Sequence, residues 1–351
     1  MITNEIKCAW IENMISIETD GYTRPCCGEN SIQSQISHIS NGILNSFNDK
    51  KIIFLRDELK KGFSKNTMPF CFRCENLESR NQKSLRTKTK FLSSNRELKL
   101  IQFKMSNKCQ LACFHCGPSQ SSTWAKKLNL SSKINKGFKI TDEFLNELST
   151  ILPNLSVIKF TGGEPFLDFN HWKILEYLKK FDRSHCELHY ITNGISNFKP
   201  VLWEGWKTIK CSVSIDGFEE SYEWFRRGST WDKILVGVQN LNDFSEVEIN
   251  YSLTPFTIQD FLKAKNFWKY KFTAIPIVYP SYANLVNFPE KIIHTIDNFQ
   301  SIPFSAYSKT DDVKNYVTWA NKWDSMWATP GWADKIFWWV KEFNDANKTN
   351  F

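Results

Sequence analysis

The chain has 351 residues, of which 41% are hydrophobic, enough to bury the core of one large domain and of one or two smaller ones. It contains no run of about 18 apolar residues, and its start lacks the basic and apolar pattern of a signal peptide, so the sequence predicts a soluble cytoplasmic protein. The formal net charge of +8 is typical of a solvated basic surface and is weak evidence for a nucleic-acid partner.

Ten cysteines are distributed unevenly, and eight of them lie in the first third of the chain. Disulfides are rare in reducing compartments, where clustered thiols indicate metal or iron–sulfur ligation. The first group comprises Cys8, Cys26, Cys27, Cys71 and Cys74. Cys186 and Cys211 stand alone beside predicted strands, and we interpret them as small buried hydrophobic residues.

Strand-like runs alternate with helical patterns between about residue 97 and residue 280. The predicted strands are Leu98–Lys104, Val157–Phe160, Glu187–Ile191, Ile209–Ile215, Val247–Leu253 and Ile275–Tyr279. One helix is expected to begin after Thr141 as its N-cap, and two more contain apolar residues at helical spacing within 172–181 and 234–241. Six strands alternating with helices predict an α/β fold, a partial (β/α)6 TIM-like barrel.

The segment KCQLACFHCGP, residues 108–118, follows the first predicted strand and places Cys109, Cys113 and Cys116 at a Cys-x3-Cys-x2-Cys spacing. The next three strands are followed by TGGEP (161–165), TNG (192–194) and SIDG (214–217). Reactive groups gather at the carboxyl ends of parallel strands, so these segments are expected at one edge of the sheet. A zinc site and a redox switch are the alternatives for the cysteines, but a structural zinc site needs a fourth close ligand, and His115 lies too near in sequence to complete it easily.

The cysteine triplet, followed one βα unit later by GGEP, resembles the radical S-adenosylmethionine (SAM) enzymes. The resemblance implies a [4Fe–4S] cluster held by Cys109, Cys113 and Cys116, whose fourth iron is chelated by SAM. It also implies reductive cleavage of SAM to a 5′-deoxyadenosyl radical that abstracts hydrogen from a substrate carbon. The residues implied for cofactor binding are His115, Gly162, Gly163, Glu164, Asn193, Ser214, Asp216 and Arg227.

Several of these assignments have simpler alternatives. GGEP alone is compatible with an ordinary β-turn, and Asn193 before a glycine is also typical of a turn. His115 stands where the family usually has an aromatic residue, and its planar ring is suited to pack on the cofactor. Arg227 is expected to pair with the SAM carboxylate, and one residue of the pair Arg226-Arg227 is expected to be only a surface charge.

The N-terminal cysteines are similar to the auxiliary-cluster motif of the twitch and SPASM subfamilies, here placed before the barrel. The resemblance implies an auxiliary iron–sulfur cluster, expected to be [4Fe–4S], held by Cys8, Cys26, Cys71 and Cys74 with Cys27 as an alternate ligand. Such a cluster suits electron transfer from a substrate radical, which would make the net reaction oxidative. A zinc knuckle and a purely structural cluster remain the alternatives.

The C-terminal region is predicted to be helical and is rich in tryptophan. Trp319, Trp323 and Trp327 recur every four residues and share one helix face, where they are expected to pack as core; an aromatic wall over the barrel mouth is the alternative. The predicted domains are an auxiliary-cluster module at 1–92, a radical SAM partial barrel at 93–284 and this helical region at 285–351.

The sequence thus predicts a radical SAM oxidoreductase or modifying enzyme. The resemblance to auxiliary-cluster enzymes implies a ribosomally made peptide or a small metabolite such as an aminosugar as the substrate, and flavodoxin or ferredoxin as the electron donor. An RNA-modifying radical SAM enzyme and a non-catalytic zinc or iron–sulfur protein are the rivals. No membrane partner is expected, and nucleic acid is disfavoured because the basic run at 80–90 has no interleaved aromatic residues.

Overall fold

The computed structural model describes residues 8–26, 34–61, 71, 74–75, 78–79, 83–88, 96–135, 137–277 and 313–347. Its strands are β1 (Met14–Ile17), β2 (Thr23–Arg24), β3 (Leu100–Lys104), β4 (Ala112–Cys113), β5 (Val157–Thr161), β6 (Arg183–Thr192), β7 (Trp206–Ser214), β8 (Arg226–Arg227), β9 (Glu246–Leu253) and β10 (Lys271–Pro276). Its helices are α1 (Ala9–Asn13), α2 (Ile43–Phe47), α3 (Lys50–Lys60), α5 (Leu85–Lys88), α6 (Ser122–Lys127), α7 (Asp142–Ile151), α8 (Phe169–Leu178), α9 (Glu220–Phe225), α10 (Trp231–Asn242), α11 (Phe261–Phe267), α13 (Val313–Met326), α14 (Trp332–Ile336) and α15 (Trp338–Asn347).

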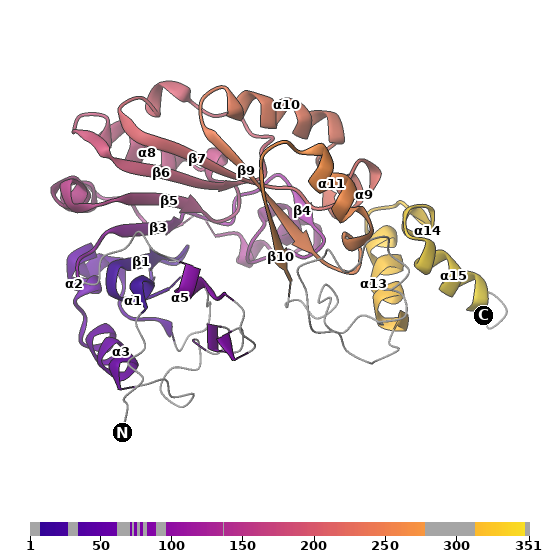
Figure 1. Cartoon of the computed structure of the whole chain (residues 1–351), viewed down its shortest axis with the longest axis horizontal. Coiled ribbons are helices and arrows are strands. Elements are labelled where there is room, and N and C mark those ends of the chain that lie inside the picture. Colours follow the sequence, from indigo (N-terminus) through magenta and orange to yellow (C-terminus); the bar gives the residue numbers. More distant parts are fainter. Residues whose placement is uncertain are drawn as a thin grey trace. The chain divides into compact units, whose positions relative to one another are not determined.

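Hydrogen bonds join most of these strands into a largely parallel sheet in the order β10-β9-β7-β6-β5-β3-β1-β2 (Figure 1). The parallel α/β partial-barrel fold and the helical C-terminal region predicted from the sequence are confirmed. The first five predicted strands lie where they were expected. The sixth strand, β10, covers Lys271–Pro276 and so begins four residues before the predicted start at 275, while residues 278 and 279 of that prediction lie outside the described residues.

The N-terminal segment adds two strands that the sequence pattern did not predict. β1 pairs in parallel with β3, with Met14 opposite Leu100 and Ser16 opposite Gln102. All four residues of β1 are buried, so the run lacks the alternation that marks a half-exposed strand. The segment assigned by sequence to the N-terminal module therefore also extends the sheet.

The chain forms two compact units, and β7 begins in the first and ends in the second. The first unit comprises residues 1–108, 134–191 and 197–210. In it, Phe103 of β3 packs against Phe144 of α7, and Phe160 of β5 packs against His171 of α8, with ring centroids 6.1 and 4.6 Å apart. One face of this part of the sheet is thus covered by α7 and α8. As predicted, α7 follows Thr141, whose hydroxyl accepts a hydrogen bond from the backbone N–H of Phe144.

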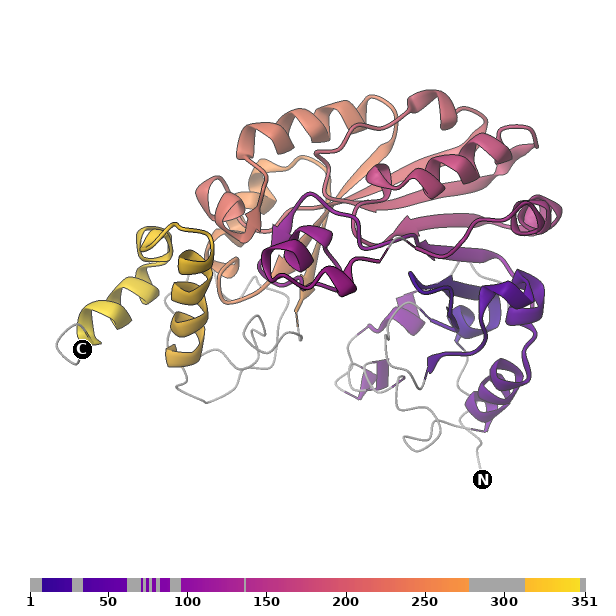
Figure 2. The same cartoon turned by 180° about the vertical axis from the view of Figure 1, so that it is seen from behind.

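The second unit comprises residues 109–133, 192–196 and 211–351, and an aromatic core holds it together. Phe114 packs against Trp224, Phe256 and Trp323 at centroid distances of 5.0, 4.8 and 5.2 Å. Trp323 belongs to α13, one of the yellow helices in Figure 2, so this tryptophan has the core-packing role expected from sequence. No helix in the described ranges combines the length and the apolar run needed to cross a bilayer.

Candidate functional site

The cysteine loop lies in the second unit, and its backbone is fixed by a segment far along the chain. β4 pairs antiparallel with β8, which sets Cys113 opposite Arg226 and Ala112 opposite Arg227. The backbone N–H of Phe114 also donates to the carbonyl of Phe225 at 2.7 Å. The loop is therefore held in a defined conformation by backbone hydrogen bonds on both strands.

The three thiols of the loop interact with one another. A hydrogen bond between Cys113 and Cys116 lowers the pKa of the Cys113 thiol and raises that of Cys116, which also interacts electrostatically with Cys109. The backbone N–H of Leu111 donates to Cys109 Sγ at 3.4 Å, and Asn193 Nδ2 donates to the same sulfur at 3.9 Å. N–H donors aimed at sulfur stabilise a thiolate, so the donor set suits metal-bound cysteine.

The described residues contain no group of three His, Cys, Asp or Glu side chains placed to hold a single metal ion. A four-iron cluster does not require such a group, because each of its cysteines binds a separate iron. The fit of the loop to a cluster therefore depends on the thiols and the polar groups around them.

Arg226 lies beside the cysteine loop and is buried, as is Arg227, so the expectation that one of them is a surface charge was wrong. Arg226 Nη1 pairs with Asp216 Oδ2 at 2.5 Å, and the other carboxylate oxygen of Asp216 accepts from the backbone N–H of Ser252 at 2.8 Å. The guanidinium of Arg226 also lowers the pKa of Cys113. Asp216 thus positions a fixed positive charge next to the loop.

Arg227 has its partners in the C-terminal region, on α13, on α14 and in the turn between them. Its Nη2 donates to Thr329 Oγ1 at 2.9 Å and pairs with Asp324 Oδ1 at 3.3 Å, and its guanidinium lies 4.1 Å from the ring centroid of Trp332. Burial lowers the pKa of Arg227 to about 10, which leaves it charged at neutral pH. Its pairing with a SAM carboxylate stays a prediction.

Polar atoms without partners surround the loop. The Nε atoms of Arg226 and Arg227 and Nδ1 of His115 are buried and make no hydrogen bond within the described residues. The His115 ring stacks on Phe225 with centroids 5.2 Å apart, and burial lowers its pKa, so it is a neutral planar group. Unpaired buried donors are costly unless a ligand satisfies them, which fits a polar cofactor at this loop.

The Asn193 side chain has both of the roles considered from the sequence. Its Nδ2 donates to Gln110 Oε1 at 3.2 Å in the cysteine loop, and its Oδ1 accepts from the backbone N–H of Ile195 at 3.1 Å in its own turn. Ser214 ends β7 and is half-buried. Contact of either residue with SAM remains a prediction.

The GGE segment lies in the first unit and packs on the residues that lead into the cysteine loop. Gly163 N–H donates to the carbonyl of Ser106 at 2.8 Å, and Glu164 N–H donates to that of Lys108, which directly precedes Cys109 in the chain, at 2.7 Å. A Cβ added to Gly163 would lie 2.4 Å from the Lys108 carbonyl oxygen. The chain's own backbone therefore requires a glycine here. The buried carboxylate of Glu164 accepts from the backbone N–H of Phe166 and anchors the turn, as expected.

Replacing Gly163 with alanine is expected to lower the free energy of unfolding by about 1–3 kcal/mol and to weaken SAM binding, because the Cβ forces residues 106–108 to move. Thermal unfolding and SAM titration of the reconstituted protein would measure both effects. Gly117→Ala is the control, since the nearest atom to its Cβ is Gln120 Oε1 at 3.3 Å, at the end of a flexible side chain. Equal stability of Gly163→Ala and the wild type would contradict this role of Gly163.

The N-terminal cysteines lie in the first unit, where the structure brings Cys8, Cys71 and Cys74 close enough to interact electrostatically. Cys8 and Cys71 both pack on a cluster formed by Ile11, Ile52, Leu55 and Leu59. Burial raises the pKa of Cys71 to about 12 and also raises that of Cys8. Cys26 is half-buried just after β2, and Cys27 lies outside the described residues.

Arg86 supplies a buried positive charge beside these thiols, a feature that the sequence analysis missed. It interacts electrostatically with Cys8, Cys71 and Cys74, and its Nε donates to Glu78 Oε1 at 3.0 Å. A fixed guanidinium stabilises thiolates and the net negative charge of a cysteine-ligated cluster. The arrangement therefore fits an iron–sulfur group, and the basic run around residue 86 was the available sequence signal.

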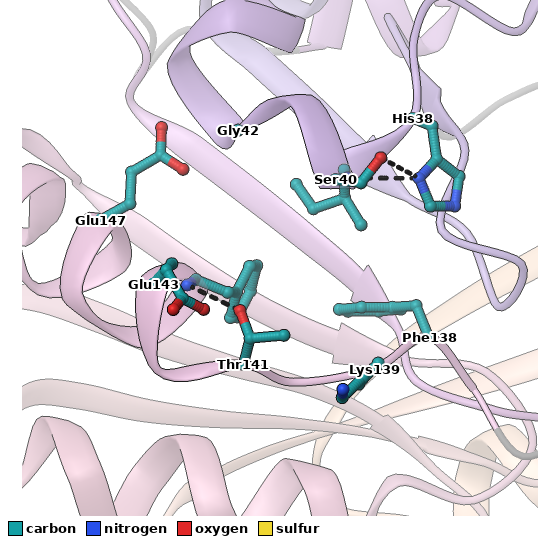
Figure 3. A pocket seen from close by; sticks show the side chains of 10 residues that line it. His38, Ser40, Gly42, Phe138, Lys139, Thr141, Glu143 and Glu147 are labelled. Atoms are coloured by element: carbon teal, nitrogen blue, oxygen red, sulfur yellow. Dashed lines mark hydrogen bonds between the residues drawn. The ribbon is translucent and has the colours of Figure 1, made fainter.

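A cavity of about 260 Å³ in the first unit contains none of these candidate residues. Figure 3 shows His38, Ser40 and Gly42 on one side of it and Phe138, Thr141 and Glu147 on the other. The Glu147 carboxylate accepts from the backbone N–H groups of Ile43 and Leu44 at 2.7 and 2.9 Å. These bonds attach the N-terminal segment to α7, which is a structural role.

Comparisons with known proteins agree with the chemistry of the cysteine loop. Residues 103–267 match the model of the radical SAM superfamily. The uncharacterised protein MJ0907 of Methanocaldococcus jannaschii is 32% identical over 126 residues, which are 35% of this chain and 40% of that protein. The GTP 3′,8-cyclase of Paenarthrobacter nicotinovorans is 25% identical over 144 residues, which are 39% of this chain and 38% of that enzyme.

Among solved structures, TYW1 with a lysine-pyruvate adduct is similar over 52% of this chain and 63% of that chain, at 15% identity and a TM-score of 0.32. A score this low does not establish a shared fold. The chain spans only 40% and 38% of the length of the two sequence relatives.

Proposed function

We propose, from the match of residues 103–267 to the radical SAM superfamily model, that this chain binds a [4Fe–4S] cluster through Cys109, Cys113 and Cys116 and cleaves SAM reductively. When bound, such a cluster supplies one electron to the SAM sulfonium, and the resulting 5′-deoxyadenosyl radical takes hydrogen from a substrate carbon. The observation that carries the proposal is the cysteine loop, fixed by β8 and supplied with N–H donors to Cys109 Sγ.

The chain's own residues hold and tune this loop. Arg226, fixed by Asp216, places positive charge beside Cys113, and Asn193 donates to Gln110 and to Cys109. The contacts of SAM with His115, Gly162, Gly163, Glu164, Asn193, Ser214, Asp216 and Arg227 are part of the proposal. The buried unpaired nitrogens of His115, Arg226 and Arg227 support a polar ligand there.

We further propose that Cys8, Cys26, Cys71 and Cys74 hold an auxiliary [4Fe–4S] cluster, with Cys27 as the alternate ligand. The proximity of Cys8, Cys71 and Cys74 to one another and to Arg86 supports this assignment. A fully ligated cluster has no open iron, so its role is to accept an electron from the substrate radical, which makes the net reaction an oxidation. Zinc on the same thiols and a structural iron–sulfur cluster without a redox role are the alternatives.

The proposed substrate is a ribosomally made peptide or a small metabolite such as an aminosugar, as in related auxiliary-cluster enzymes, and RNA is the rival suggested by the net charge of +8. The name GTP 3′,8-cyclase carried by one relative favours a small metabolite. If the substrate is RNA, the affinity of the protein for RNA is expected to fall steeply as the salt concentration rises. An affinity that does not change with salt would exclude RNA as the substrate.

Anaerobic reconstitution followed by dithionite and SAM tests the proposal. About eight irons per chain, by the four-iron cubane count, and the formation of 5′-deoxyadenosine are expected. Bound zinc without SAM cleavage would instead support a non-catalytic metal protein. Deuterium transfer from labelled candidate substrates into 5′-deoxyadenosine would then identify the substrate and the abstracted hydrogen, and flavodoxin or ferredoxin is expected to replace dithionite.

A further inference from the structure

A row of polar side chains crosses the sheet of the first unit on the face opposite α7 and α8. Strand register places Ser16 beside Gln102, Gln102 beside Lys159, and Lys159 beside His189. The alternate positions, such as Phe103 and Phe160, contact α7 and α8. In (β/α) barrels the helices cover the outside, so this polar row lies on the inner face.

The carboxylates on this inner face already have cationic partners. Glu18 Oε2 pairs with Lys104 Nζ at 2.8 Å, and its Oε1 lies 3.7 Å from Arg24 Nε. Glu187 Oε2 lies 2.8 Å from Lys210 Nζ and 2.8 Å from His189 Nε2. Burial lowers the pKa of His189, so its imidazole is neutral near pH 7. Neither carboxylate forms an ion pair with Lys159.

Lys159, at the centre of the row, is half-buried, and its ammonium makes no hydrogen bond or ion pair within the described ranges. A partly desolvated ammonium without a counter-charge is unfavourable, and an anion that reaches it relieves this cost. The neighbours Gln102 and His189 are neutral polar groups, which add hydrogen-bonding capacity without competing charge.

The polar row lies next to the row of the sheet against which Cys8, one of the proposed auxiliary ligands, packs. Met14, Leu100 and Val157 form the preceding row, and Trp10 and Cys8 pack against it. The two rows are two residues apart, which is about 7 Å at the rise of a β-strand. A group bound at Lys159 would therefore lie near Cys8 on the same face, as a substrate that passes an electron to an auxiliary cluster requires.

We propose that Lys159 binds an anionic group of the substrate, a carboxylate or a phosphate, on the inner face of the sheet. This inference rests on the proposed function and narrows its substrate class to anionic molecules. Gln102 and His189 flank the bound group in the row. Glu18 and Glu187 are paired with other cations, so their carboxylates do not neutralise the Lys159 ammonium.

Calorimetric titration of the reconstituted full chain with citrate and with tripolyphosphate tests the inference. Lys159→Met is expected to weaken binding at least about tenfold, the loss of one charge-assisted hydrogen bond, while Lys159→Arg retains most of it. Lys173→Met is the matched control, because Lys173 is also half-buried but lies on α8, where its ammonium donates to the Ile140 carbonyl at 3.1 Å. Its affinity is expected to stay within about twofold of wild type.

If the wild type binds tripolyphosphate more tightly than citrate, the anionic group of the substrate is assigned as a phosphate. If it binds citrate more tightly, the group is assigned as a carboxylate. Absence of binding to the wild type, or equal affinities of wild type and Lys159→Met, overturns the inference. Far-ultraviolet circular dichroism checks that each variant is folded. If Lys159→Met does not fold, the anion affinity of Lys159→Arg is compared with that of the wild type instead. Production of 5′-deoxyadenosine by the wild type is measured in parallel, so a failure of the proposed function appears as no SAM cleavage, separately from the anion titration.

Discussion

Replacing Cys109, Cys113 or Cys116 with alanine is expected to reduce 5′-deoxyadenosine formation about a thousandfold or more, equivalent to about 4 kcal/mol on the barrier. Each of these thiols is assigned to a different iron, and loss of one leaves the cluster without the ligand set that keeps a single iron open to SAM. Iron content is expected to fall from about eight to about four per chain, because the auxiliary cluster is retained. Iron analysis and chromatographic detection of 5′-deoxyadenosine would measure both changes.

Cys186→Ala is the matched control for these variants. Cys186 is a buried cysteine of β6 whose thiol donates weakly to the carbonyl of Glu187, and it lies outside both cysteine groups in the sequence. Its replacement is expected to leave iron content and SAM cleavage unchanged. Turnover at the wild-type rate after loss of any residue of the triplet would contradict the assignment of the cluster.

The double replacement Cys71→Ser/Cys74→Ser is expected to remove the auxiliary cluster and to separate the two parts of the reaction. Iron content should fall by about four per chain, and reductive cleavage of SAM should continue. Oxidised product should no longer form, because the substrate radical loses its electron acceptor. Iron and zinc analysis, together with mass spectrometry of the product, would detect these outcomes; zinc in the wild type and unchanged product in the variant would refute an electron-transfer role.

Single replacements show which of the adjacent residues Cys26 and Cys27 is the ligand of the auxiliary cluster. Cys26→Ser is expected to lose the auxiliary iron, whereas Cys27→Ser is expected to retain it. The opposite result would exchange the ligand assignment of the two residues without affecting the rest of the account.

Local sequence patterns were sufficient to predict the strands that precede the cysteine loop and the other candidate site segments. The strand before Cys109 and the strands before GGEP, TNG and SIDG lie where apolar runs predicted them, and α7 begins directly after its predicted N-cap, Thr141. Each of these features is encoded within a few residues by strand patterning or capping chemistry. The two-residue strand β4 has no such pattern, because it exists only through its pairing with β8.

Contacts between distant segments were the part that sequence reasoning missed. Arg226 and Arg227 are adjacent and chemically identical, yet Arg226 pairs with Asp216 while Arg227 pairs with Asp324, 97 residues away. Similarly, the pairing of Met14–Ile17 with β3 depends on the fold of the whole first unit. Propensity and periodicity describe a window of the chain, whereas partner choice depends on which segments the fold brings together.

The central claim is that the cluster on Cys109, Cys113 and Cys116 has one iron open to SAM. Electron–nuclear double resonance of the reduced, reconstituted protein with SAM carrying 15N in its amino group and 17O in its carboxylate tests this most directly. The account predicts hyperfine coupling of both labels to the cluster, in the wild type and in Cys71→Ser/Cys74→Ser alike. A cluster that shows no coupling to either label in the presence of saturating SAM would contradict it.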